Sequence, residues 1–209
     1  MMGYDERDCI EPDAIPPLDP GTSLLVAGPP MVGKREFALD LMTAGYEDGD
    51  GLLVIMTSES AAVVLEDLSD QLEQLDPQRI GVIDCLDNND RQSFEGIQAY
   101  SLSSPDDLTG ISTTSAMHLR SFADNGIKTV RHGLICVTTL LQYLERDTVF
   151  KFLYIYKKRI ADTRGLGVFT IDRTRHEERT LTMFESLFDG MLDLRVGDNG
   201  EPDLHTQGI

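Results

Sequence analysis

The sequence is poor in basic residues, and this shortage limits the partners that the protein can have. It carries 18 Lys and Arg against 36 Asp and Glu, so its formal net charge is −18 and its pI is about 4.4. A folded domain this acidic repels the phosphates of DNA at long range, and direct nucleic-acid binding is therefore not expected. Because 41% of the residues are hydrophobic, the chain is also not a disordered acidic tail.

Cysteine is scarce, and the chain shows no pattern of metal ligands. None of its three cysteines has C-x-x-C or other metal-ligand spacing. Cys85 and Cys136 end or lie within apolar, strand-like runs, which predicts buried thiols in a reducing compartment. The four histidines do not group as ligands either, so we predict no structural zinc and assign no metal ligands. They are His118, His132, His176 and His205.

Long apolar runs are missing as well. No segment approaches the ~18–20 apolar residues that a transmembrane helix needs. The acidic N-terminus lacks the basic start and apolar core of a signal peptide. We therefore expect no membrane insertion and a cytoplasmic location. The acidic balance further predicts a halophilic cytoplasm, where concentrated salt screens the self-repulsion of the chain.

The few basic residues are concentrated in one part of the chain. Residues 126–180 hold eleven Lys and Arg against six Asp and Glu, whereas the other 154 residues hold seven against thirty. One interpretation is that this basic segment pairs with acidic surface elsewhere on the fold or on a neighbouring molecule. The alternative is that it forms an anion-binding or subunit contact.

The order of apolar and amphipathic segments predicts one α/β domain over residues 21–209, preceded by an extended, acidic, Pro-rich arm over residues 1–20. Alternating strands and helices favour a three-layer fold with a mostly parallel central sheet, and a C-terminal hairpin adds an antiparallel edge. Residues 86–111 read as a long polar connection. The expected strands are 23–27, 51–57, 80–85, 131–137, 166–171, 190–196 and 203–207, and the expected helices are 35–42, 60–75, 113–124, 139–144 (capped by Thr138), 149–162 and 177–187.

The most informative motif is G-x-x-x-x-G-K, which lies between the first strand and the first helix. Glycines let such a loop wrap around a polyphosphate, whose charge is attracted by backbone N–H groups and the helix N-terminus. Lys34 is the strongest candidate for a phosphate contact, although Pro29 and Pro30 remove two N–H groups. The candidate ATP-binding residues are Gly28, Pro29, Pro30, Met31, Val32, Gly33, Lys34 and Arg35.

The residues that would hold Mg²⁺ beside this loop are missing. Arg35 stands where the motif requires Ser or Thr, and a guanidinium cannot ligate a metal. The strand 133–137 should end in an Asp, but it places Ile135 or Cys136 there. Both losses argue against bound Mg²⁺. Asp84, at the end of another apolar strand, is a candidate substitute for the missing Asp, although the order along the chain favours the later strand.

Other polar residues follow the predicted strands. Glu59 follows the second strand and is the candidate catalytic base, although a glutamate near a helix start also serves as a dipole partner. Asp172 ends a later strand and is followed by Arg173, Arg175 and His176; these form either a sensing site at the ligand crevice or a solvated turn. The aromatic stripe 150–156 suits the core or a subunit interface better than a base-stacking platform.

Several segments together resemble the small KaiC-like proteins of the RecA superfamily from halophilic archaea. The resemblance implies a RecA-type core, ATP as a ligand of residues 28–34, self-association and a signalling or regulatory role. Active relatives keep Ser or Thr after the lysine, an acid on the later strand and often paired glutamates, where this chain has Arg35, Ile135 and only Glu59. The segments that carry the resemblance are Leu24–Lys34, Glu47–Gly51, Ser104–Ile111, Thr138–Tyr143 and Leu187–Met191.

These observations favour a regulatory or signalling pseudo-ATPase, a degenerate KaiC-like domain that binds ATP weakly or not at all. It would act through protein contacts, by self-association or with a regulatory protein partner. The alternative is an active Mg²⁺-dependent ATPase with atypical metal ligands such as Glu59 or Asp84. A DNA-recombination ATPase is the least favoured hypothesis, because the surface is acidic and no DNA-binding module is appended.

Overall fold

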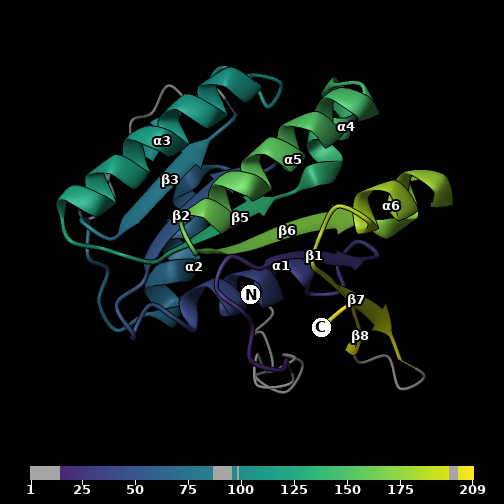
Figure 1. Ribbon diagram of the computed structural model, residues 1–209, viewed down its shortest axis with the longest axis horizontal. Coiled ribbons are helices and arrows are strands. Elements are labelled where there is room, and N and C mark those ends of the chain that lie inside the picture. Colours follow the sequence, from purple (N-terminus) through teal and green to yellow (C-terminus); the bar gives the residue numbers. More distant parts are fainter. Residues whose placement is uncertain (1–14, 87–95, 98, 198–201) are drawn as a thin grey trace, which may run out of the picture.

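A computed structural model describes residues 15–86, 96–97, 99–197 and 202–209. They form an eight-stranded sheet in the order β4-β3-β2-β5-β6-β1-β7-β8, parallel except for the antiparallel pair β7-β8 at one edge (Figure 1). The predicted fold class is confirmed. The strands are β1 (Ser23–Gly28), β2 (Gly51–Met56), β3 (Ile80–Asp84), β4 (Ala99–Ser101), β5 (Val130–Ile135), β6 (Leu166–Asp172), β7 (Gly190–Val196) and β8 (Pro202–Gln207).

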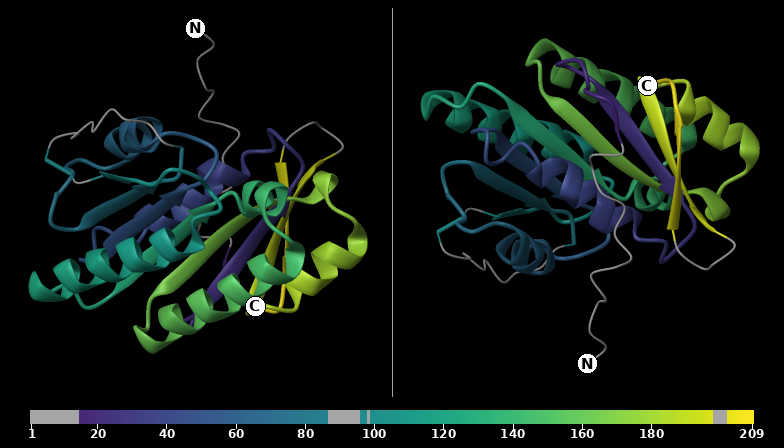
Figure 2. Two further views of the ribbon diagram at one scale, coloured as in Figure 1. Left: turned by 90° about the horizontal axis from the view of Figure 1, so that it is seen from above. Right: turned by 90° about the horizontal axis from the view of Figure 1, so that it is seen from below.

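Helices cover both faces of the sheet (Figures 1 and 2). Successive side chains of a strand point to opposite faces, so Leu24 and Val26 pack with α1 and α2, while Leu25 and Ala27 pack with the helices of the other face. The central strands are apolar on both faces because both are covered. The helices are α1 (Lys34–Thr43), α2 (Ala61–Gln71), α3 (Leu108–Asp124), α4 (Val137–Tyr143), α5 (Arg146–Asp162) and α6 (Glu178–Glu185).

The predicted long connection at 86–111 was wrong in part. It contains the edge strand β4, and α3 begins at Leu108 rather than near residue 113. The Asp107 side chain caps this helix by accepting a hydrogen bond from the Gly110 N–H at 2.7 Å. Residues 87–95 and 98 lie outside the described part of the chain, as do residues 1–14 of the predicted arm and residues 198–200 of the predicted hairpin turn.

The predicted junction near residue 136 also needs correction. Strand β5 ends at Ile135, Cys136 is the N-cap of α4, and Thr138 lies inside the helix instead of capping it. The apolar pattern continues from strand into helix here, so the sequence gives no break between them. Cys85 is buried as predicted, but Cys136 is only half-buried.

The aromatic stripe is split between the core and the surface. Phe152 and Tyr156 are buried, whereas Tyr154 is 60% exposed on the outer face of α5. Within the described residues, no helix is long and apolar enough to cross a membrane.

Two histidines lie inside the protein. Burial lowers the pKa of His118 to about 4 and that of His132 to about 3. The His132 Nδ1 lies 3.2 Å from the Tyr156 hydroxyl, which donates to Ser115 Oγ at 3.1 Å. The Nε2 atoms of both histidines are buried and have no hydrogen-bond partner among the described residues. Protonation of either ring would place an unpaired charge in the core.

We expect stability to depend on these histidines at mildly acidic pH. In the unfolded chain these two histidines bind protons near pH 6.5. In the folded chain they do not bind protons until the pH approaches 3–4. Stability is therefore full above pH 6.5, and each histidine costs up to about 1.4 kcal/mol per pH unit below it. Urea unfolding from pH 7 to 4.5 should show a shallower loss for His132→Asn than for the parent. The exposed His205→Asn is the control, and equal slopes in all three proteins would contradict the expectation.

Candidate functional site at the carboxyl edge of the sheet

The loop that carries the G-x-x-x-x-G-K motif joins β1 to α1 at the carboxyl edge of the parallel sheet. Strand β1 lies between β6 and β7, with Gly28 opposite Asp172 and Ala27 opposite Asp193. Ligands of open α/β sheets bind outside this edge. The register therefore brings two acidic residues from distant segments beside the loop.

Two glycines are needed for the shape of the loop. A Cβ at Gly28 would lie 2.8 Å from Val32 Cγ1 and 2.9 Å from the Leu194 carbonyl oxygen, so a side chain there would displace the backbone. Gly33 has φ +84°, the left-handed region that glycine adopts without strain. Met31 also has a positive φ of 61°, and its side chain is fully exposed at the loop tip. A non-glycine residue in this region is strained, which is a frequent property of functional loops.

The Lys34 side chain folds over the loop. Its ammonium group donates a hydrogen bond to the Pro29 carbonyl at 2.8 Å. Burial lowers the pKa of Lys34, while the nearby Asp172 carboxylate partly opposes this change. No described side chain caps the start of α1, so its first N–H groups can bind an anion. Lys34 and this helix start together form the part of the site that suits a phosphate.

Arg35 points away from the loop and toward α2. Its Nε donates to Glu59 Oε2 at 2.7 Å, and its Nη2 donates to Asp67 Oδ2. The guanidinium is largely enclosed, with 17% of the side chain exposed. Arg35 therefore does not occupy the phosphate position. It ties the first turn of α1 to α2 and to the segment after β2.

Glu59 is held by this contact. One oxygen of the candidate catalytic base accepts the Arg35 hydrogen bond, so the carboxylate is already neutralised by a cation. The Arg35 guanidinium therefore holds this carboxylate beside α2. The catalytic role of Glu59 stays a prediction.

The structure gives no support to a metal site at the expected positions. Strand β5 ends at Ile135, which is apolar and buried. Asp84 of β3 is four strands from β1, about 19 Å at the usual strand spacing, too far to share a metal with the loop. Its two oxygens accept the N–H groups of Ala61 and Leu86 at 2.9 Å, so its role is structural. In the described part of the chain no three His, Cys, Asp or Glu side chains group as metal ligands.

Asp172 lies opposite Gly28 in the sheet, and it organises the turn after β6. Its Oδ1 accepts from the Thr174 N–H and hydroxyl, and its Oδ2 lies 3.0 Å from Arg175 Nε. Its own N–H donates to the Thr138 hydroxyl at 2.8 Å, and that hydroxyl lies 2.9 Å from His176 Nε2. Burial lowers the pKa of His176. The predicted group around Asp172 is thus a hydrogen-bonded turn in which Thr174 and Arg175 are exposed.

A second acidic residue near the loop was missed by sequence reasoning. Asp193 of β7 is fully buried, and its Oδ2 lies 3.0 Å from Arg173 Nη1 and 2.8 Å from Arg195 Nη2. Its Oδ1 is buried with no hydrogen-bond partner among the described residues. The one available signal was an acid within the apolar run Met191–Leu194. A buried carboxylate in such a run requires a cationic partner.

A family model described as "Family of unknown function (DUF7504)" matches residues 21–194. The chain belongs to this family. The matched range includes the 28–35 loop, Glu59, the Asp172 cluster and Asp193, so all these features belong to the family domain. No curated protein matches the chain.

Solved structures with a KaiC-like fold resemble this one. The KaiC-like protein PH0186 from the hyperthermophilic archaeon Pyrococcus horikoshii has a TM-score of 0.62 and 14% identity, over 89% of this chain and 78% of its own. The uncharacterized protein PH0321 from the same organism, in complex with an unknown peptide, has a TM-score of 0.66 and 14% identity, over 90% and 93% of the two chains. At this identity the likeness establishes a RecA/KaiC-like fold.

The contact of Arg35 with Glu59 and Asp67 should be measurable as stability. Arg35→Ala leaves two carboxylates facing each other, and we expect the free energy of unfolding to fall by about 1 kcal/mol at low salt. The loss should shrink in molar KCl, because salt screens both the attraction and the remaining repulsion. Urea unfolding at two salt concentrations measures this. Lys151→Ala, which removes an exposed cation without a described ion pair, is the control; equal effects of the two substitutions would refute the contact.

Proposed function

We propose that this protein is a KaiC-like regulatory or signalling domain that binds nucleotide through its phosphates without Mg²⁺ and does not turn it over efficiently. The observation that carries the proposal is the position of Arg35. Arg35 stands where the motif has its metal-binding hydroxyl, and Glu59 and Asp67 hold its guanidinium toward α2. The loop thereby keeps the groups that suit a phosphate, which are Lys34 and the start of α1, and lacks the hydroxyl that would bind a metal.

The residues present suit a polyphosphate. Lys34 and the free N–H groups of α1 would hold the terminal phosphates, and a bound anion would replace the Pro29 carbonyl as partner of the ammonium group. Arg175 follows the strand paired with β1; it is 58% exposed and pairs with Asp172, so a second cation lies at the same edge. Fixed cations can neutralise phosphate charge where a metal is lacking. The nucleotide would supply a ligand-dependent signal rather than a hydrolysis step.

Protein contacts would transmit that signal. The outer surface of α3, α4 and α5 exposes Met117, Tyr143, Tyr154 and Ile155. Lys151 and Lys158 of α5 lie on the same helix and have no ion pair among the described residues. The opposite face carries the acidic residues of α1 and α2. These surfaces are complementary in charge, which supports self-association of two copies through different faces. The peptide in the PH0321 complex supports a protein-contact role for this fold. We place the protein in a salt-rich cytoplasm, which suits its acidity.

A second candidate function, a Mg²⁺-dependent ATPase, is favoured by one observation. Asp172 lies opposite Gly28 in the register and is the described acid best placed to replace the one missing from β5. Against this, both of its oxygens are already bound by Thr174 and Arg175. Under this alternative, Asp172→Asn would abolish ATP hydrolysis.

Calorimetric titration with ATP in molar KCl, with and without Mg²⁺, tests the proposed function. We expect binding that Mg²⁺ does not strengthen, no phosphate release above the blank, and loss of binding in Lys34→Ala. Sedimentation of the same samples reports whether ATP changes self-association. Mg²⁺-dependent binding with phosphate release that Lys34→Ala abolishes would refute the proposal. A complete lack of binding would reduce the protein to an interaction scaffold.

Replacing the two lost residues should restore a metal requirement. In Arg35→Ser/Cys136→Asp, the hydroxyl returns to the first turn of α1, and a carboxylate takes the half-buried N-cap of α4, where Asp is favourable. We expect ATP affinity to rise on adding Mg²⁺ by about tenfold, which corresponds to roughly 1.4 kcal/mol. Each single variant is the control and should gain less. A double variant that stays insensitive to Mg²⁺ while folded would show that other residues exclude the metal.

A further inference from the structure

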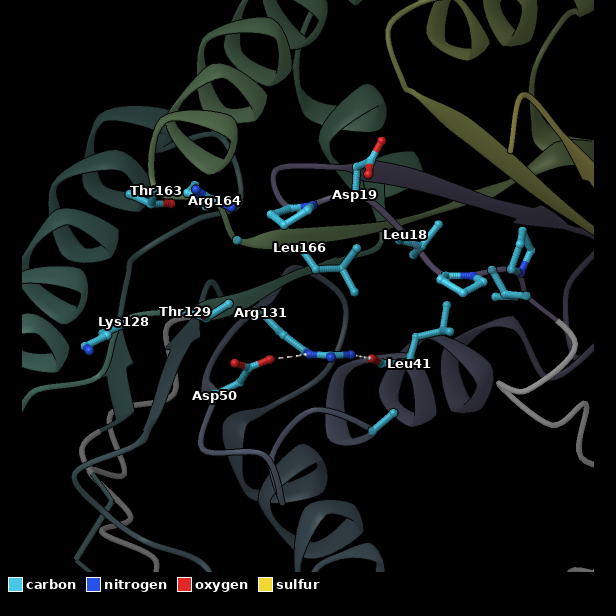
Figure 3. A pocket seen from close by; sticks show the side chains of 16 residues that line it. Leu18, Asp19, Leu41, Asp50, Lys128, Thr129, Arg131, Thr163, Arg164 and Leu166 are labelled. Atoms are coloured by element: carbon cyan, nitrogen blue, oxygen red, sulfur yellow. Dashed lines mark hydrogen bonds and ion pairs between the residues drawn. The ribbon is translucent and has the colours of Figure 1, made fainter.

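A cavity lies at the amino edge of the sheet, opposite the 28–35 loop. It has a volume of about 890 Å³, opens to solvent, and is lined by residues 15–20, the end of α1, and the segments that lead into β5 and β6 (Figure 3). Pockets for small ligands usually measure about 300–1,000 Å³. The cavity is therefore large enough for a ligand of its own.

The segment 15–20 is fixed in place as one wall of this cavity. Ile15 and Leu18 pack against the core cluster of the α1–α2 face. At its end, the Thr22 N–H and hydroxyl donate to the Asp19 carbonyl at 3.1 and 2.6 Å, and the Gly21 N–H donates to the Gly165 carbonyl at 2.8 Å. The wall is thus attached to the core and to the start of β6, as a preformed site requires.

Two exposed cations of the lining lie apart from its leucine side chains. Figure 3 shows Lys128 and Arg164 on one side and Leu18 and Leu41 on the other, with Leu166 between them. Lys128 and Arg164 have no ion pair or side-chain hydrogen bond among the described residues, although the protein has twice as many acidic as basic residues. A cavity with two free cations at one end and an aliphatic surface at the other suits an amphipathic anion.

Arg131 adds a third cation on the floor of the cavity. Its Nε donates to Asp50 Oδ2 at 2.8 Å and its Nη1 to the Leu41 carbonyl at 2.7 Å, whereas its Nη2 has no partner among the described residues. The guanidinium lies against Gly45, where a Cβ would approach it to 2.1 Å. The carboxylate of Asp19 points away from Arg131 in Figure 3. Arg131 can therefore donate an N–H to a ligand in the cavity, while Asp50 is paired with Arg131 and the Asp19 carboxylate points away.

We infer that this cavity binds a small amphipathic anion, a carboxylate or phosphate joined to an aliphatic body. The headgroup binds at Lys128 and Arg164, and the aliphatic body packs on Leu18, Leu41 and Leu166. The site would use three basic residues of the segment 126–180, which are Lys128, Arg131 and Arg164. The inference does not depend on nucleotide binding, because the site lies at the other edge of the sheet.

Calorimetry with decanoate and with decyl phosphate, each below its micelle-forming concentration, tests this assignment and distinguishes the two headgroups. Binding of either supports it. Acetate and inorganic phosphate test the headgroup contacts alone, and decanol tests the aliphatic contacts alone. All three should bind more weakly than the amphiphiles. Decanol binding as tightly as decanoate and decyl phosphate would overturn the assignment, as would a failure of both amphiphiles to bind.

Two variants test the site itself. Lys128→Ala/Arg164→Ala should weaken amphiphile binding by about tenfold or more, since two charge-assisted contacts are lost. Arg120→Ala/Arg179→Ala removes the same charge from exposed positions on α3 and α6 and should have no effect. Ala44→Phe places a ring in the cavity and should abolish binding without changing any charge. Circular dichroism confirms folding of each variant. Unchanged binding in Ala44→Phe, or equal losses in the two charge variants, would refute the site.

Discussion

The pairing of β1 between β6 and β7 is the constraint on which the carboxyl edge depends. Because β1 is hydrogen-bonded on both sides, its end is fixed relative to Asp172 and Asp193, which are more than 140 residues away in sequence. A Cβ at Gly28 would also meet the Leu194 carbonyl of β7. The loop therefore starts from a rigid point, and its glycines and the strained Met31 then direct it over the start of α1.

A loop with the G-x-x-x-x-G-K motif ordinarily serves both phosphate binding and metal binding, and Arg35 separates these two tasks. A hydroxyl at this position would have to face the phosphate, whereas a guanidinium reaches Glu59 and Asp67. The residue that stands where the motif has Ser or Thr also pairs with the candidate base and links α1 to α2. Its positive charge is satisfied by acids outside the loop. Under the proposed function, this leaves Lys34 and the start of α1 to bind the anion.

Helix α1 connects the two edges of the sheet. It begins at Lys34 beside the loop and ends beside the amino-edge cavity, whose lining includes Leu41 and Ala44. Its ten residues span about 15 Å. The Leu41 carbonyl near its end accepts from Arg131, and its first turn is held by Arg35. Both ends of one rigid element are thus fixed by arginines that lie beside a candidate site.

The sequence by itself determined the α/β fold, the position of the loop and the presence of Arg35 and Ile135 where the motifs have a hydroxyl and an acid, because strand alternation and motif spacing are local properties. It could not locate β4, which is a short edge strand in a polar segment, or the end of β5, where an apolar strand runs into an apolar helix. Only the tertiary structure decided that Arg35 binds Glu59 and Asp67, that Asp84 is four strands from the loop, and that Asp193 pairs with Arg173. Those facts depend on strand order and side-chain direction. Both are set by long-range packing that no local pattern encodes.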